Sequence, residues 1–227
     1  MDAAKLKEPS SEQEVSEALK GFYGDKAFGS DGFIMAFWQS SWDFMKERVI
    51  GFFRDFHNHS WFVKSPNAIF IVLIPKKGRR GRAEDLRDFR PISLVEGLYK
   101  WLAKVLANKL KMVVGKVVSK VQNAFVDGRQ ILDDVLVANE IIDSILKSNE
   151  GAVICKLDIE NAYDHVEWSF LFPVMSMMGF GEKWIRWVQW CISTVSFSIL
   201  VNGSSSRFFQ SSKGLRQENP LSPYLFL

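Results

Sequence analysis

The stretch Val153-Ile154-Cys155-Lys156-Leu157-Asp158-Ile159-Glu160-Asn161-Ala162-Tyr163-Asp164 places an aspartate directly after a short apolar run. The run at residues 152–157 predicts a buried strand, and open α/β sheets hold their sites at the carboxyl ends of such strands. Asp158 can supply one of the hard oxygen ligands that Mg²⁺ prefers, with the backbone carbonyl of Ile159 as a second. An aspartate at this point can equally cap the following helix, because Asp is a favoured N-cap residue.

Further apolar runs and helical patterns lie on both sides of this stretch. The run Ala68-Ile69-Phe70-Ile71-Val72-Leu73-Ile74 predicts a second buried strand, which Pro75 ends. Asn202-Gly203 is the strongest short hairpin signal available. Strands are expected on either side of it, at residues 197–201 and 207–210. Helices are expected at residues 95–114, 129–146, 168–178 and 182–193.

The two ends of the sequence carry helical signals. Ser11-Glu12-Gln13-Glu14 has the spacing of a capping box and predicts a short helix that ends at about residue 20. Residues 34–57 form a long amphipathic pattern, whose aromatic stripe we assign to the core. Residues 90–93 are expected to lead into the helix at 95–114. Residues 221–227 look like the apolar start of a helix, so we expect a fragment of a larger protein that is cut inside this element.

The composition is that of a soluble globular chain. Of the 227 residues, 47% are hydrophobic and 24% are charged, which excludes a disordered tail and a collagen-like rod. The two cysteines, Cys155 and Cys191, lie far apart and indicate neither a zinc site nor a disulfide framework. The charged N-terminus lacks a secretory signal. The longest apolar run is much shorter than the ~20 residues of a membrane-spanning helix, so we expect an intracellular location.

Charge is distributed unevenly along the chain, although the net charge is only +3. Residues 51–120 carry 15 basic and five acidic side chains, whereas residues 121–165 carry three basic and nine acidic ones. A basic block beside an acidic block fits a polyanion that is held next to a cation site. The alternative is that long helices carry solvated Lys and Arg faces.

Four short motifs follow one another in order. They are Ile74-Pro75-Lys76-Lys77, Phe89-Arg90-Pro91-Ile92-Ser93, the stretch quoted first, and Gly214-Leu215-Arg216-Gln217-Glu218-Asn219-Pro220-Leu221-Ser222-Pro223. Two more segments accompany them, Lys26-Ala27-Phe28-Gly29-Ser30-Asp31-Gly32-Phe33 and Gln122-Asn123-Ala124-Phe125-Val126-Asp127-Gly128-Arg129-Gln130-Ile131. Together they resemble the reverse transcriptase domain of non-LTR (LINE-type) retrotransposons, most of all those of plant genomes. The resemblance covers nearly the whole chain.

The resemblance implies an acidic site and a group of phosphate-binding residues. Asp158 is similar to the first metal-binding aspartate of a polymerase that uses two Mg²⁺ ions, with the Ile159 carbonyl as a further ligand. Lys76 and Arg90 match the residues that hold the incoming triphosphate, one as a point charge and one as a planar fork. Other cations nearby either contact the nucleic-acid backbone or are solvated; they are Lys77, Arg79, Arg80, Arg82 and Arg87.

The resemblance also implies residues that contact the sugar of the nucleotide. Tyr163 falls at the steric-gate position, where an aromatic ring leaves no room for a ribose 2′-hydroxyl. Gln217 matches the glutamine that packs against the nucleotide near its sugar. Asp164 is expected to be structural. Five side chains are therefore expected around one cleft: Lys76, Arg90, Asp158, Tyr163 and Gln217.

The fold implied by the resemblance is α/β (α+β), of the right-hand polymerase type, with a mixed sheet and helices packed on one side. Residues 1–65 would form an N-terminal helical extension. Residues 66–151 would form a fingers-like region, and residues 152–227 a truncated palm.

Two departures from the family pattern bear on activity. The sequence ends before the Tyr/Phe-x-Asp-Asp hairpin that carries the family's other metal-binding aspartates, and Asp158 alone cannot hold two Mg²⁺ ions. Glu218-Asn219 stands where the family has Gly-Asp, and a Cβ at the glycine position restricts the backbone. We therefore expect a fragment of an RNA-directed DNA polymerase that is inactive by itself.

The alternative is a non-catalytic remnant that binds RNA or DNA through the basic fingers region. The resemblance implies that the intact parent protein uses Mg²⁺, deoxynucleoside triphosphates, an RNA template and a DNA primer. The resemblance further implies that the protein is located in the nucleus or the cytoplasm and does not bind membranes.

Overall fold

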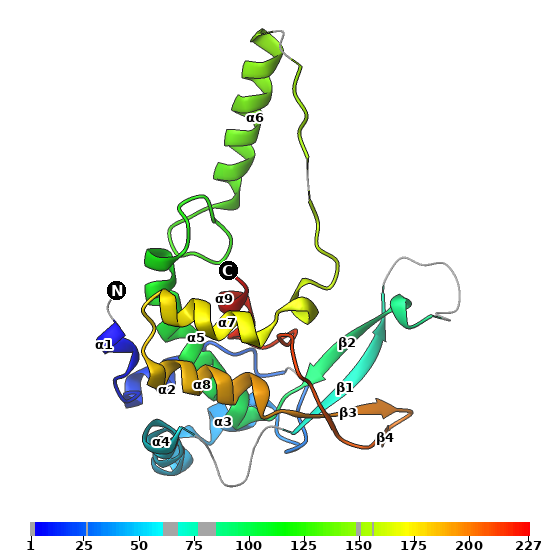
Figure 1. The fold of residues 1–227 in the computed structure, drawn as a ribbon. Coiled ribbons are helices and arrows are strands. Elements are labelled where there is room, and N and C mark those ends of the chain that lie inside the picture. Colours follow the sequence, from blue (N-terminus) through cyan, green and yellow to red (C-terminus); the bar gives the residue numbers. More distant parts are fainter. Residues whose placement is uncertain (1–2, 26, 61–67, 77–84, 149–150, 156) are drawn as a thin grey trace.

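The computed structural model describes residues 3–25, 27–60, 68–76, 85–148, 151–155 and 157–227. A helical body forms most of the molecule, and a small sheet and one long helix project from it (Figure 1). The α-helices are α1 (Ala3–Leu6), α2 (Glu12–Lys20), α3 (Met35–Ser40), α4 (Trp42–His59), α5 (Gly97–Val117), α6 (Ile131–Ser148), α7 (Trp168–Met177), α8 (Glu182–Ser193) and α9 (Ser222–Phe226). The 3-10 helices are η1 (Leu86–Asp88) and η2 (Ala162–His165), and the strands are β1 (Ala68–Pro75), β2 (Phe89–Leu94), β3 (Ser196–Val201), β4 (Ser204–Ser205) and β5 (Phe209–Gln210).

The sheet is mixed, which confirms the expected α/β class. β1 pairs with β2 in antiparallel fashion, from Phe70 opposite Leu94 to Pro75 opposite Phe89. The same strand pairs with β3 in parallel, and β3 in turn pairs with β4 and β5. The order β2-β1-β3-β4 leaves β2 at the edge of the described sheet. An edge strand tolerates Pro91, because one side of its backbone forms no ladder.

Helix α5 lies at the centre of the hydrophobic core, with both Tyr99 and Trp101 0% exposed. The indole Nε1 of Trp101 donates a hydrogen bond to the Val15 carbonyl at 2.8 Å and so joins α5 to α2. Lys109 is also buried, and its ammonium donates to the Glu8 carbonyl at 2.8 Å. Burial lowers the pKa of this lysine. The N-terminal segment is therefore fixed to α5 by polar contacts as well as by packing.

Several sequence-based expectations are confirmed where the local signal is strong. Ser11 caps α2 in a complete capping box with Glu14. Asn202 and Gly203 adopt φ values of 50° and 81° and turn β3 into β4. Both central residues of such a turn need positive φ, which Asn and Gly adopt at the least cost. The helices expected at 95–114, 129–146, 168–178 and 182–193 are present as α5, α6, α7 and α8.

Two expectations upstream of α5 are corrected by the structure. The long amphipathic helix expected at 34–57 is divided at Ser41 into α3 and α4. Residues 89–94 form strand β2 instead of a lead into α5, because β1 offers a full ladder of partners over this length. The run at 68–74 is a strand as expected, but only Ile69 in it is fully buried, since the sheet projects from the body.

The buried strand expected at residues 152–157 is wrong. Residues 151–155 and 157–159 are irregular and exposed, with Val153 93% exposed. Figure 1 shows this segment returning from the tip of α6 toward the body. No described strand pairs with it, and an apolar run without a ladder partner cannot satisfy its backbone as a buried strand.

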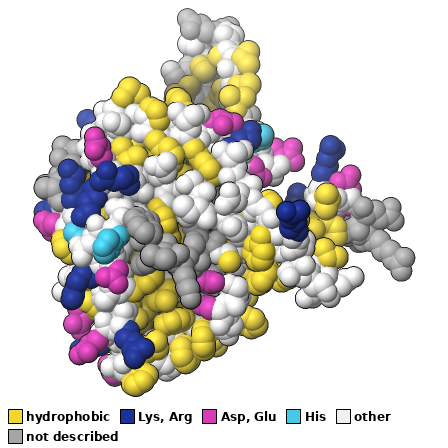
Figure 2. Space-filling view, turned by 60° about the horizontal axis from the view of Figure 1, so that its bottom comes forward, with side chains coloured by type: hydrophobic (Ala, Val, Ile, Leu, Met, Phe, Trp, Pro, Cys, Tyr) yellow, Lys and Arg dark blue, Asp and Glu magenta, His cyan; other side chains and the backbone are white. Residues whose placement is uncertain are grey.

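Helix α6 has the expected amphipathic pattern, but its apolar face is not covered. None of its described side chains is buried, and Figure 1 shows the helix standing away from the body. Figure 2 shows hydrophobic side chains on the surface of the part that projects at the top. Among the helices of the described residues, none combines the length and the apolar character that crossing a bilayer demands.

We predict that Trp101→Ala lowers the free energy of unfolding by about 3–5 kcal/mol, because it opens a cavity in the core and removes the hydrogen bond from the indole to the Val15 carbonyl. Urea denaturation followed by far-UV circular dichroism measures the change. Phe44→Ala is the matched control, since Phe44 is 90% exposed and its loss should change the stability by less than about 0.5 kcal/mol. Equal effects of the two variants would contradict the central place of α5.

Candidate functional site

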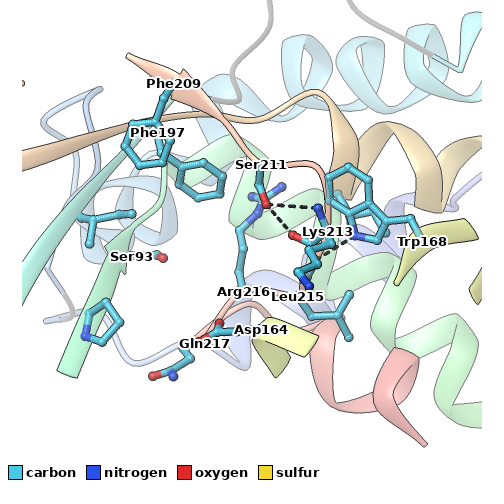
Figure 3. A pocket seen from close by; sticks show the side chains of 14 residues that line it. Ser93, Asp164, Trp168, Phe197, Phe209, Ser211, Lys213, Leu215, Arg216 and Gln217 are labelled. Atoms are coloured by element: carbon cyan, nitrogen blue, oxygen red, sulfur yellow. Dashed lines mark hydrogen bonds between the residues drawn. The ribbon is translucent and has the colours of Figure 1, made fainter. Parts of the chain in front are cut away.

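A cleft of about 300 Å³ opens where the sheet meets the helical body. Figure 3 shows its two sides. The strands contribute one side, through Ile71, Pro91, Ser93, Phe197 and Phe209. The segment from η2 to α7 and the loop at residues 211–217 contribute the other side, through Asp164, Trp168, Ser211, Lys213, Gly214, Leu215, Arg216 and Gln217; Ile192 of α8 also lines the cleft.

Three hydrogen bonds that involve the loop's backbone hold the loop at residues 211–217 against η2 and α7. The backbone N–H of Gly214 donates to the Val166 carbonyl at 2.8 Å, and that of Leu215 donates to the Tyr163 carbonyl at 2.8 Å. The Trp168 indole donates to the Gly214 carbonyl, also at 2.8 Å. Gly214 has φ +90°, a conformation that residues with a Cβ rarely adopt. The Gly214 backbone therefore positions the loop through its hydrogen bonds, and the absence of a Cβ permits the φ value that these bonds require.

A buried polar cluster lies behind the same loop. The Arg216 guanidinium packs over the Tyr99 ring, with 4.7 Å from Cζ to the ring centroid, and donates to the Cys191 carbonyl. The Tyr99 hydroxyl donates to the same carbonyl at 2.8 Å and accepts from the Asn219 amide at 3.1 Å. Burial raises the pKa of Tyr99, raises that of Cys191 to about 12, and lowers that of Arg216. The phenol and the thiol therefore remain protonated at neutral pH.

The sequence model of one protein family, reverse transcriptase (RNA-dependent DNA polymerase), matches residues 74–227. The chain belongs to the reverse transcriptase family. The match includes β2, the segment from η2 to α7 and the loop at 211–217, and these elements form most of the cleft.

Curated relatives place this reverse transcriptase sequence among retrotransposon proteins. It is 27% identical over 225 residues to the transposon TX1 uncharacterized 149 kDa protein of Xenopus laevis, which covers 98% of this chain and 17% of that protein. It is 27% identical over 220 residues to a retrovirus-related Pol polyprotein from the type-1 retrotransposable element R2 of Popillia japonica, covering 96% of this chain and 29% of that protein. A similar polyprotein, from the type-2 element R2DM of Drosophila melanogaster, is 26% identical over 169 residues, or 73% of this chain and 16% of the polyprotein. The expected assignment to part of a reverse transcriptase of a non-LTR retrotransposon is confirmed, and the chain spans less than a third of the length of each of these relatives.

Among the five residues expected around one cleft, Gln217 alone lines it. Tyr163 lies beside the cleft and is linked to it through its carbonyl, which accepts from Leu215. Its half-buried ring packs against Phe226 with 5.3 Å between centroids, and desolvation raises its pKa. Asp164 lines the cleft next to Tyr163, whereas the sequence suggested only a structural position for it.

Lys76 and Arg90 lie together, but away from the cleft. Arg90 is opposite Ile74 in the β1–β2 ladder, and the backbone N–H of Lys76 donates to the Asp88 carbonyl at 2.8 Å. Side chains alternate along a strand, so Arg90 faces away from its neighbour Pro91, which lines the cleft. Both cations are exposed. The other cations of this region, Lys77, Arg79, Arg80 and Arg82, lie outside the described residues.

Asp158 and Ile159 are also separate from the cleft, on the exposed irregular segment that follows α6. Reverse transcriptases use divalent metal ions. Within the described part of the chain, however, no three His, Cys, Asp or Glu side chains are placed to share a metal ion. The described residues therefore do not fit a Mg²⁺ centre, and the role of Asp158 as a ligand stays a prediction. The convergence expected for all five residues is not found, because Asp158 has no strand to place it and Arg90 lies on the other face of β2.

Sequence reasoning missed the aromatic wall of the cleft. Phe197 and Phe209 are opposite each other in the ladder, yet a regular hairpin around Asn202-Gly203 would place Phe208 there. The pairing is regular at Leu200 opposite Ser205 and is shifted by one residue at Phe197. This β-bulge changes which phenylalanine shares a face with Phe197. Asn202-Gly203 predicted the hairpin, but nothing in the sequence predicted the bulge.

Glu218, which stands where the resemblance leads us to expect glycine, has an unusual backbone conformation. Glu218 adopts φ 63°, in the left-handed region. The family's glycine suits that region at the least cost, whereas a residue with a Cβ is strained there. Glu218 therefore holds a backbone conformation that a glycine adopts at less cost.

We predict that Gly214→Ala destabilises the protein by about 1–2 kcal/mol, because alanine is strained at φ +90°. Thermal or urea unfolding measures the change. The matched control is Gly51→Ala in the middle of α4, where an added Cβ meets nothing within 4 Å. This control should stabilise the protein by about 0.5–1 kcal/mol, so the two variants are expected to differ in sign; a shared sign would contradict the strained loop.

Proposed function

We propose that this chain supplies the template- and nucleotide-binding part of an RNA-directed DNA polymerase from a non-LTR retrotransposon. The observation that carries the proposal is the cleft, since it contains Gln217 and is built mostly from segments within the family match. In this proposal residues 1–65 are the N-terminal helical extension, residues 66–151 the fingers and residues 152–227 the palm. The order and the amino-acid sequences of the motifs support a plant retrotransposon as the source.

Lys76 and Arg90 hold the triphosphate of the incoming nucleotide in this proposal. A compact ammonium and a planar guanidinium are two complementary ways to bind phosphate oxygens. Lys76 directly follows the last residue of β1, and Arg90 is the second residue of β2. Both side chains are exposed at the same end of the β1–β2 pair, which supports a joint role. Because Arg90 lies on the face of β2 away from Pro91, the proposal includes a shift of the β1–β2 pair relative to the cleft when the nucleotide binds.

Tyr163 and Gln217 contact the sugar of the nucleotide in the same proposal. The Tyr163 ring excludes a ribose 2′-hydroxyl, and the hydrogen bond from Leu215 to its carbonyl keeps it beside the loop that carries Gln217. Asp158 is the first acidic ligand of the polymerase, with Ile159 as its carbonyl neighbour. Among the described residues, no three ligating side chains are placed to share a metal ion.

The second candidate function is a nucleic-acid-binding module without polymerase activity. The exposed, isolated position of Asp158 favours it. The excess of basic residues at 51–120 supports phosphate-driven binding that needs no metal centre.

We predict that the 227-residue polypeptide does not extend a DNA primer on an RNA template with Mg²⁺ or Mn²⁺. The described part of the chain places Asp158 in no group of three side chains that could share a metal ion, and loss of the metals costs on the order of 10³-fold or more in rate. A denaturing gel of a labelled primer measures extension, with a viral reverse transcriptase as the positive control. Extension that Asp158→Ala abolishes would overturn the predicted inactivity and support the polymerase over the binding module.

We predict salt-dependent binding of a primer–template duplex by the same polypeptide. In the binding-module alternative, Lys76 and Arg90 contact phosphates of the duplex, so Lys76→Ala combined with Arg90→Ala should reduce the slope of log K against log salt by about 2, because each lost phosphate contact contributes about one. If the two side chains hold only the triphosphate of a nucleotide, the slope for the duplex should stay unchanged. Fluorescence anisotropy measures the affinities. The charge-matched control is Lys20→Ala with Lys46→Ala on α2 and α4, which should leave the slope unchanged. A flat salt response of the unaltered protein would rule out phosphate-driven binding.

A further inference from the structure

The cleft has a flat apolar wall made of two phenylalanine rings. Phe197 of β3 and Phe209 of β5 stack with 5.8 Å between their centroids and 30° between their planes. Phe197 is 9% exposed, so its place in the wall is fixed by the body. Phe209 is 45% exposed and presents ring surface to the cleft.

Polar groups face this wall across the cleft. Figure 3 shows Phe197 and Phe209 at the upper left, Ser211 and Lys213 to their right, and Gln217 below them. Lys213 forms an ion pair with Glu167, 3.1 Å from Nζ to Oε1, but both side chains are about half exposed. Exposed ion pairs of this kind contribute little stability. The ammonium of Lys213 can therefore exchange its carboxylate for a phosphate oxygen at little cost.

A flat apolar wall opposite hydrogen-bonding groups and a cation suits a planar ring with polar edges that is joined to a phosphate. The volume of about 300 Å³ is at the lower end for small-ligand sites, which suits a single base unit. We propose that the cleft binds an unpaired base of a nucleic-acid strand, stacked on Phe209, with Lys213 against the adjoining phosphate. The inference rests on the proposed function. It adds to that function which part of a nucleic-acid strand the cleft binds, namely an unpaired base and the adjoining phosphate.

Stacking on an aromatic side chain is tolerant of sequence, because every base has a π-face. The cleft therefore discriminates between a strand with bases and a strand without them, and not between one base and another. Polar edge contacts from Ser211 and Gln217 adjust the orientation of the base, whereas most of the binding free energy comes from the ring of Phe209.

The chain offers a closely matched control for Phe209. Phe208 is its neighbour, is exposed to nearly the same extent at 48%, and is also in contact with a phenylalanine, Phe70, at 6.1 Å between centroids. Phe208 does not line the cleft, because alternation along the strand turns it to the other face. Substitution of Phe208 thus removes nearly the same exposed ring area from one face of the sheet as substitution of Phe209 removes from the other.

The experiment compares two short labelled RNA strands of equal length and charge, one an oligouridylate and the other an abasic ribose–phosphate chain. Fluorescence anisotropy gives their affinities for the full 227-residue protein. We expect the unaltered protein to prefer the oligouridylate by about 5- to 150-fold for one stacked base. Phe209→Ala and Phe209→Leu should abolish this preference, whereas Phe209→Trp and Phe208→Ala should keep it. Affinity for the abasic strand should be equal in all variants.

The outcomes separate this inference from the function on which it rests. Binding of both strands with equal affinity by the unaltered protein overturns the base site and leaves phosphate-driven binding intact. Failure to bind either strand overturns the proposed nucleic-acid function itself. Equal loss of the preference in Phe208→Ala and Phe209→Ala also overturns the base site. Near-UV circular dichroism checks folding, and Phe209→Leu, which keeps an apolar side chain of similar size, carries the test if Phe209→Ala does not fold.

Discussion

The guanidinium of Arg216 on the ring of Tyr99 is the contact on which the candidate site depends. It joins the loop at 211–217 to α5, while the hydrogen bond of Arg216 to the Cys191 carbonyl joins the same loop to α8. Tyr99 and Asn219 complete the cluster within the core. Gln217 is the next residue in the chain, so its position at the cleft follows from the anchoring of Arg216 in this buried cluster.

Local signals in the sequence predicted much of the fold. The capping box at Ser11 and the turn at Asn202-Gly203 are found as expected, because each depends on residues within a few positions of one another. Strand β2 was missed, because Arg90-Pro91-Ile92-Ser93 becomes a strand only through the ladder that β1 provides. The strand expected at 152–157 failed for the converse reason, since its composition suits a strand but no described strand pairs with it.

The candidate site shows the same division between local and long-range information. The motif at 214–223 identified Gln217, and the family match supports that resemblance. The face on which a side chain lies could not be predicted from the motif. Arg90 falls on the far face of β2, and a one-residue bulge exchanges Phe208 for Phe209 opposite Phe197. Single-residue shifts of this kind move a side chain to the other face of a sheet, so the motif led to Gln217 but could not show which side chains lie beside it.

The exposed helix α6 has a consequence for cooperativity. Tertiary packing supplies most of the stability of helices in proteins, and none of the described side chains of this 18-residue helix is buried. Its backbone hydrogen bonds therefore open without disturbing Trp101 or the rest of the core around α5. In hydrogen–deuterium exchange, the amides of α6 form a fast-exchanging unit of their own, while those of α5 exchange only when the whole body unfolds.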